Sequence, residues 1–206
     1  MSIAAQLEAD YGWMTTSAFT EDHLALLLQA AWNLQAFADQ MLDGGGLAWL
    51  HRNLTPIYFH LGGAPQAAAS WLVRKKMSLV FPQRDVWLAR PFISMANPAQ
   101  HIIHELAHVL DNRLAGRSLP ATFFGGGPAD RLVLEMGGRP RGLRFANGTC
   151  GIPPANQWSP VSGGGYGNHG SAEYFAEAFA WSLFYPMHLP SPVILNWLKT
   201  NVFLAA

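Results

Sequence analysis

The chain has 206 residues, enough for one domain with a sizeable hydrophobic core. Half of the residues are hydrophobic and only 13% are charged, a composition that excludes an intrinsically disordered chain. Lysine plus arginine number 13, as do aspartate plus glutamate, so a net charge of zero gives no bulk attraction to nucleic acid or to an anionic membrane.

The first residues lack the pattern of a secretory signal, because Glu8 and Asp10 are acidic and no basic start precedes an apolar core. This leaves a cytoplasmic protein, a signal already removed, or export by a non-classical route as the expected cases. No uninterrupted apolar stretch of about 18 residues occurs, so we expect no membrane span. The single cysteine, Cys150, rules out an intramolecular disulfide and a cysteine-rich zinc site.

The N-terminal half predicts one long helix followed by short strands. Residues 20–42 have helical periodicity, with Thr20 as the N-cap and two acidic residues in the first turn. Three short apolar runs then have the composition of strands, at residues 54–61, 78–81 and 86–88. We expect them to form a small, mainly antiparallel sheet.

The C-terminal half is expected to be mostly helical, with long loops. Asn97 and Pro98 are suited to open a helix that runs to about Asn112. Residues 117–170 are rich in glycine and proline, with room for one short helix at about 130–136, and loops of this length are often functional. Ser171 is expected to cap a second strong helix that ends near Phe184, and an amphipathic segment covers 191–204.

The predicted helix after Pro98 contains the motif His-Glu-x-x-His. His104 and His108 are separated by four residues, so both rings lie on one face of the helix and can reach one metal ion. Glu105 follows the first histidine and is placed to act as the general base on a zinc-bound water. Zn²⁺ favours such nitrogen donors with one position left open. The alternative is two hydrogen-bonded helix histidines beside a surface glutamate.

The second strong helix supplies candidates to complete the site. Glu173 and Glu177 again have a spacing of four, on a helix that is otherwise almost entirely apolar. We expect Glu173 to be the third zinc ligand, and Glu177 to accept a hydrogen bond from a ligand histidine and so fix its ring. A solvent-facing acidic stripe is the alternative. For His101, one turn before His104, the sequence leaves open whether it shapes a cleft or only caps the helix.

These motifs resemble those of the anthrax lethal factor catalytic domain and of the bacterial Pro-Pro endopeptidases. The resemblance covers His104-Glu105-x-x-His108-x-x-Asp111, the tyrosine seven residues before Glu173, and the run Glu173-Tyr174-Phe175-Ala176-Glu177-Ala178-Phe179. It implies that Tyr166 donates its hydroxyl to the oxyanion. It also implies that Asp111 supports a ligand or the fold without touching the metal.

The resemblance further implies an α+β, zincin-like fold of the gluzincin type. We expect a single domain over residues 1–206, with an N-terminal lobe of about 1–113, a mostly helical C-terminal lobe of about 114–206, and the active-site cleft between them. An antiparallel edge strand, for which 86–93 is the candidate, would pair with an extended peptide or protein substrate.

The expected function is therefore zinc-dependent hydrolysis of peptide bonds by a monomeric metalloendopeptidase. Three alternatives share parts of this site. A toxin-type effector protease would use the same chemistry on one specific protein, a pseudopeptidase would bind zinc or a partner without catalysis, and a related hydrolase would act on a non-peptide amide. Trp158, in a loop rich in proline and glycine, is a candidate for a wall of the substrate site.

Overall fold

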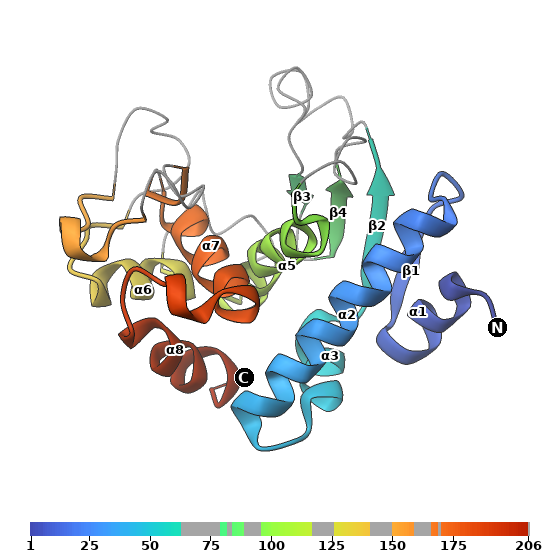
Figure 1. The fold of residues 1–206 in the computed structure, drawn as a ribbon, viewed down its shortest axis with the longest axis horizontal. Coiled ribbons are helices and arrows are strands. Elements are labelled where there is room, and N and C mark those ends of the chain that lie inside the picture. The colour runs from blue at the N-terminus through green and yellow to red at the C-terminus, as the bar shows by residue number, and fades with distance from the viewer. Residues whose placement is uncertain are drawn as a thin grey trace.

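The structure is a computed structural model that describes residues 1–62, 79–81, 84–88, 96–116, 126–140, 150–158, 166–168 and 170–205. Helices and strands both occur, and helices dominate (Figure 1). The principal helices are α1 (Ile3–Tyr11), α2 (Glu21–Leu42), α3 (Gly46–Leu54), α5 (Pro98–Leu114), α6 (Pro128–Glu135), α7 (Ser171–Phe184) and α8 (Val193–Leu198). Short helical turns are η4 (Pro154–Asn156), η6 (Tyr166–Asn168), η7 (Pro186–His188) and the π-helical η8 (Lys199–Phe203).

Four short strands form one sheet in the order β1 (Trp13–Thr15), β2 (Ile57–Leu61), β4 (Asp85–Leu88), β3 (Leu79–Phe81). β1, β2 and β4 run parallel, and only β3 is antiparallel to its neighbour. The prediction of a mainly antiparallel sheet is therefore wrong. The reason is that β1 and β2 are joined by a crossover containing α2 and α3, which makes them parallel, whereas only β3 and β4 are joined by a short connection.

The position of β4 contradicts the expectation that residues 86–88 belong to an edge strand that pairs with a substrate. β4 lies between β2 and β3, so residues 86–88 are inside the sheet and not at an edge. Residues 89–93 of the predicted edge strand lie outside the described part of the chain. Among the described strands, β3 occupies the edge on this side of the sheet, and it packs near α5.

The helix predicted over residues 20–42 is confirmed as α2. The Thr20 hydroxyl accepts from the backbone N–H of His23, and the N–H of Thr20 donates to His23 Nδ1, which closes a capping box. Two helices and one strand, α1, β1 and α3, were not predicted. The strand predicted from residue 54 begins only at Ile57, because α3 continues to Leu54.

The two helices that carry the predicted motifs pack side by side in the middle of the molecule (Figure 1). α5 begins as expected, with Asn97 Oδ1 accepting from the backbone N–H of Gln100 and Pro98 in the first turn. At its other end, Arg113 donates to the backbone carbonyls of Asn53, Thr55 and Pro56, which attaches α5 to the end of α3 and the start of β2.

The apolar side of α5 is completely buried, with side chains of Ile102, Ile103, Leu106, Val109 and Leu110 in the core. α7 is buried along nearly its whole length. Its N-cap is Gly170 in extended conformation, not the predicted Ser171, which is the first helical residue. Polar side chains on the facing sides of these two helices are therefore expected to form hydrogen bonds or ion pairs with one another.

No helix among the described residues is long and apolar enough to span a lipid bilayer. The division of the domain into lobes near residues 113 and 114 stays a prediction.

Candidate metal centre

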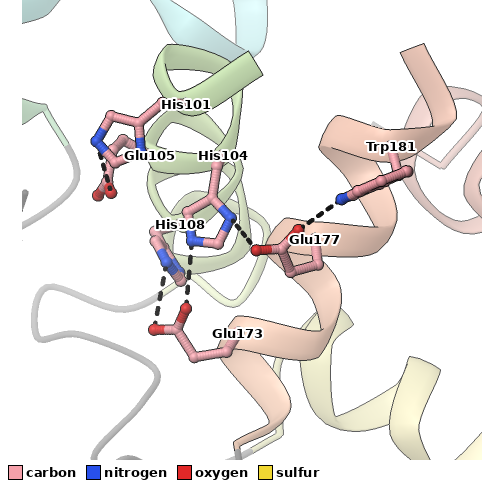
Figure 2. Close-up of polar contacts among 7 residues, drawn as sticks. All are labelled: His101, His104, Glu105, His108, Glu173, Glu177 and Trp181. Atoms are coloured by element: carbon pink, nitrogen blue, oxygen red, sulfur yellow. Dashed lines mark hydrogen bonds and ion pairs between the residues drawn. The ribbon is translucent and has the colours of Figure 1, made fainter. Parts of the chain in front are cut away.

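His104 and His108 of α5 meet Glu173 of α7 where the two helices face each other (Figure 2). His104 Nε2 lies 3.2 Å from Glu173 Oε2, and His108 Nε2 lies 3.6 Å from Glu173 Oε1. The two imidazole rings are 4.9 Å apart and nearly perpendicular, at 82°. Both His side chains are only 13% exposed and that of Glu173 is 7% exposed, so the cluster is largely withdrawn from water.

One donor atom from each of these three residues can be chosen so that all lie within 4.8 Å of one another, which is close enough to hold a metal ion. A tetrahedral Zn²⁺ site with bonds of about 2.0–2.1 Å places its ligand atoms about 3.4 Å apart. His104 Nε2 lies 3.2 Å from one Glu173 oxygen and His108 Nε2 lies 3.6 Å from the other, and both distances are close to that value. Two imidazoles and one carboxylate are also a donor set that zinc accepts with an open fourth position. The residues present therefore fit a metal of this kind.

Glu177 stands behind His104, on the side away from Glu173. Its Oε1 lies 3.4 Å from His104 Nδ1, and its Oε2 accepts a hydrogen bond of 2.8 Å from the indole N–H of Trp181 (Figure 2). The contact with Nδ1 leaves Nε2 of the same ring directed toward Glu173. A ligand histidine is commonly held in this way, because a carboxylate on one ring nitrogen fixes the tautomer that coordinates through the other.

Glu105 is buried, with its side chain 7% exposed, and its Oε1 lies 3.9 Å from Nε2 of His101. Burial raises the pKa of Glu105 to about 7; the charge of His104 works against this shift, and the charges of Glu173 and Glu177 reinforce it. A carboxyl group that titrates near neutral pH is able both to accept and to return a proton. His101 therefore contacts the proposed base, and it does not cap α5, because Asn97 does.

The charge state of the metal-free cluster follows from burial and from the two carboxylates. Burial lowers the pKa of His108 to about 4; the charge of Glu173 works against this shift, and the charge of His104 adds to it. Burial also disfavours the charged form of His104, but its hydrogen bond with Glu173 and the charges of Glu173, Glu105 and Glu177 prevail and raise its pKa to about 9. Burial opposes ionisation of Glu173 too, and the two histidines overcome it and lower the pKa. At neutral pH a proton on His104 thus occupies part of the place suited to a metal.

Asp111 is not one of the three residues that could hold a metal. Its Oδ1 accepts a 2.8 Å hydrogen bond from the backbone N–H of Ala129, in the first turn of α6. Gly127, the N-cap of α6, has no side chain for this purpose, and an added Cβ there would lie 2.7 Å from the same oxygen. Asp111 therefore caps α6 from α5, and it connects the helix of the histidines to the next helix.

The backbone of Tyr166 lies in η6, which packs against α7, while its side chain lies outside the described part of the structure. The following residue, Gly167, fits closely: an added Cβ would lie 2.8 Å from Trp158 Cδ1 and 3.0 Å from Glu177 Cγ. Asn168 Oδ1 accepts from the backbone N–H of Trp158, and Asn168 Nδ2 donates to the Trp158 backbone carbonyl, both at 3.1 Å. The turn that begins at Tyr166 is thus fixed beside Glu177.

Trp158 is buried, with 2% exposure, and contacts Tyr174 and Trp181, so it does not form a wall open to solvent. The contact of Trp181 with Glu177 was not predicted from the sequence. Trp181 lies four residues after Glu177, the same spacing that relates His104 to His108, and this spacing indicates a contact on one face of α7.

Comparisons of the chain with protein-family models, with curated proteins and with solved structures find no match. The resemblance to lethal factor and the Pro-Pro endopeptidases therefore depends on the motif residues alone, and the gluzincin fold stays a prediction. What the structure supports is a mixed helix and strand fold and a group of side chains that could hold a metal ion.

Proposed function

We propose that the protein is a zinc-dependent metalloendopeptidase. The observation that carries this proposal is the convergence of His104, His108 and Glu173 from two helices, with Glu105 next to the first of them in the chain. Zinc held by these residues would act as a Lewis acid and make a water nucleophilic near neutral pH.

Glu105 is the general base in this proposal. It is buried and adjoins the first ligand histidine in the chain, and a carboxylate in that position can take a proton from the attacking water and then deliver it to the leaving amine. Tyr166 is proposed as the donor to the oxyanion of the tetrahedral intermediate, on the basis of its spacing to Glu173 and the fixed turn that follows it.

The substrate is proposed to be a peptide or protein segment bound in extended form. Exposed strand edges recognise such segments through backbone hydrogen bonds. In the described sheet, β3 is the edge strand nearest α5, so the proposed pairing moves from residues 86–93 to Leu79–Phe81.

The test compares the zinc-loaded wild type with Glu105→Gln on a mixed peptide library, with products read by mass spectrometry. Glu105→Gln keeps the size of the side chain and removes its base, so we expect zinc to remain bound and cleavage to fall by at least 100-fold. Glu135→Gln, a matched change at an exposed position, should cleave like the wild type.

Cleavage that survives in Glu105→Gln would contradict the assigned mechanism. A wild type that binds zinc and cleaves no peptide in the library would contradict a general endopeptidase and favour an effector with one protein substrate, a non-peptide amide hydrolase or a pseudopeptidase.

A further inference from the structure

The contacts of Glu177 continue into a second group of side chains behind the metal centre. Trp181 lies four residues after Glu177 on the same face of α7, and its indole N–H donates to Glu177 Oε2 at 2.8 Å. A hydrogen bond from an N–H to a carboxylate is among the stronger kinds in proteins. The oxygen that remains, Oε1, is the one 3.4 Å from His104 Nδ1.

The indole of Trp181 is itself held by aromatic neighbours. Its ring lies 5.0 Å from that of Tyr185, 5.8 Å from that of Trp158 and 6.3 Å from that of His188. These neighbours come from η7, from the loop at Trp158 and from the end of α7. The direction of the Trp181 N–H is therefore set by packing on several sides and not by α7 alone.

The same aromatic group is hydrogen-bonded to the N-cap of α5. The hydroxyl of Tyr185 accepts a hydrogen bond of 3.2 Å from Asn97 Nδ2, while Asn97 Oδ1 caps α5. α5 and the aromatic group at the end of α7 are thus connected twice, once through Asn97 and Tyr185 and once through His104, Glu177 and Trp181.

We propose that Trp181 is a positioning residue for the metal centre. Its N–H holds Glu177 so that Oε1 faces His104 Nδ1, which keeps the ring oriented with Nε2 directed at the metal. Without this donor, the Glu177 carboxylate loses its hydrogen bond from α7 and can turn away from His104. Supporting contacts of ligand histidines commonly change metal affinity by about 10–100-fold.

The proposal rests on the metal site of the proposed function, and it does not depend on peptide hydrolysis. Trp181→Phe keeps an aromatic ring in the cluster and removes the N–H donor. The matched control is Trp158→Phe, because Trp158 belongs to the same cluster and its N–H has no partner among the described residues.

The experiment is a double-mutant cycle on zinc affinity, measured by competition with a chromophoric chelator, for wild type, Trp181→Phe, Glu177→Ala and the double variant. We expect Trp181→Phe to weaken zinc binding about 10-fold, and to add less than about 2-fold in the Glu177→Ala background. Trp158→Phe also alters the packing around Trp181 but removes no donor to Glu177, so it should weaken zinc binding by less than about 2-fold. A second readout is the long-range ¹H–¹⁵N NMR spectrum of the zinc-loaded protein, in which the protected Nδ1–H of His104 should exchange faster in Trp181→Phe.

An equal loss of affinity in the wild-type and Glu177→Ala backgrounds would overturn the proposal, because Trp181 would then act by packing alone. Unchanged affinity and an unchanged His104 signal in Trp181→Phe would also overturn it. If Trp181→Phe fails to fold, replacement of Trp181 by benzothienylalanine removes the N–H while keeping the ring shape, with the same expected result. A wild type that binds no zinc would instead refute the proposed function, and this inference with it.

Discussion

His104 Nε2 and Glu173 Oε2 lie 3.2 Å apart although 69 residues separate them in the chain. The contact joins α5 to α7, and both side chains are largely buried, at 13% and 7% exposed. A metal ion bound by both residues would therefore stabilise the packing of the two helices as well as the site itself.

Zinc should accordingly raise the stability of the whole domain. A ligand that binds only the folded state adds about 2.7 kcal/mol at a free concentration 100 times its Kd, which corresponds to a rise in Tm of roughly 5–10 °C for a domain of this size. Differential scanning fluorimetry with and without zinc measures the rise. In Glu173→Gln it should be mostly lost. An equal rise in that variant would show that zinc binds elsewhere.

Zinc affinity should increase with pH between about 7 and 9. In the metal-free protein the pKa of His104 is raised to about 9, so its proton is bound below that pH and must be expelled by the metal. His108, with a pKa lowered to about 4, is already neutral in this range. The logarithm of the association constant should therefore rise by about one per pH unit and level off above pH 9. Calorimetric titrations in buffers of different ionisation enthalpy should show about one proton released; an affinity independent of pH would contradict the assigned charge state.

Asp111→Ala should destabilise the fold while leaving zinc binding intact. The change leaves the N–H of Ala129 without its buried acceptor and removes the cap of α6, which costs about 1–3 kcal/mol. Urea unfolding measures the loss, and Glu135→Gln on the exposed side of α6 is the control. A large fall in zinc affinity with little change in stability would place Asp111 at the metal instead.

Gly167→Ala should perturb the neighbours of the metal centre. The added methyl group would lie 2.8 Å from Trp158 Cδ1 and 3.0 Å from Glu177 Cγ, so the turn or Glu177 must move. We expect a loss of about 1–3 kcal/mol from overpacking, with weaker zinc binding as Glu177 shifts. Urea unfolding and zinc titration of the same variant measure both effects. Unchanged values would mean that the turn moves freely.

The three residues that could hold a metal ion could be predicted because their signals are local. His104, Glu105 and His108 follow from one helical spacing, and the pair Glu173 and Glu177 is conspicuous because two carboxylates interrupt a helix that is otherwise apolar. Trp181 could not be singled out by its type, because tryptophan on a buried helix is ordinarily part of the core. Its bond to Glu177 depends on which way the indole faces, and its aromatic neighbours determine that direction.

The sheet could be predicted only in part, because strand direction depends on segments far apart in the chain. β1 has three residues, Trp13, Met14 and Thr15, which are too few to give an alternating pattern. Without β1, the strand at Ile57 is taken as the first of the sheet, and the crossover through α2 and α3 that makes β2 parallel to β1 is not recognised. The helices α2, α5 and α7 were predicted correctly because their periodicity extends over several turns and α2 and α5 begin with clear capping residues.

The most direct test of the central claim is to titrate the metal while measuring peptide hydrolysis. The protein is stripped with a chelator, zinc is returned in known amounts, and cleavage of a peptide mixture is followed by mass spectrometry. We predict no cleavage by the metal-free protein and a linear gain that ends at one zinc per chain. Cleavage that persists without metal, or a complete lack of cleavage at one bound zinc per chain, would contradict the assignment of a zinc metalloendopeptidase.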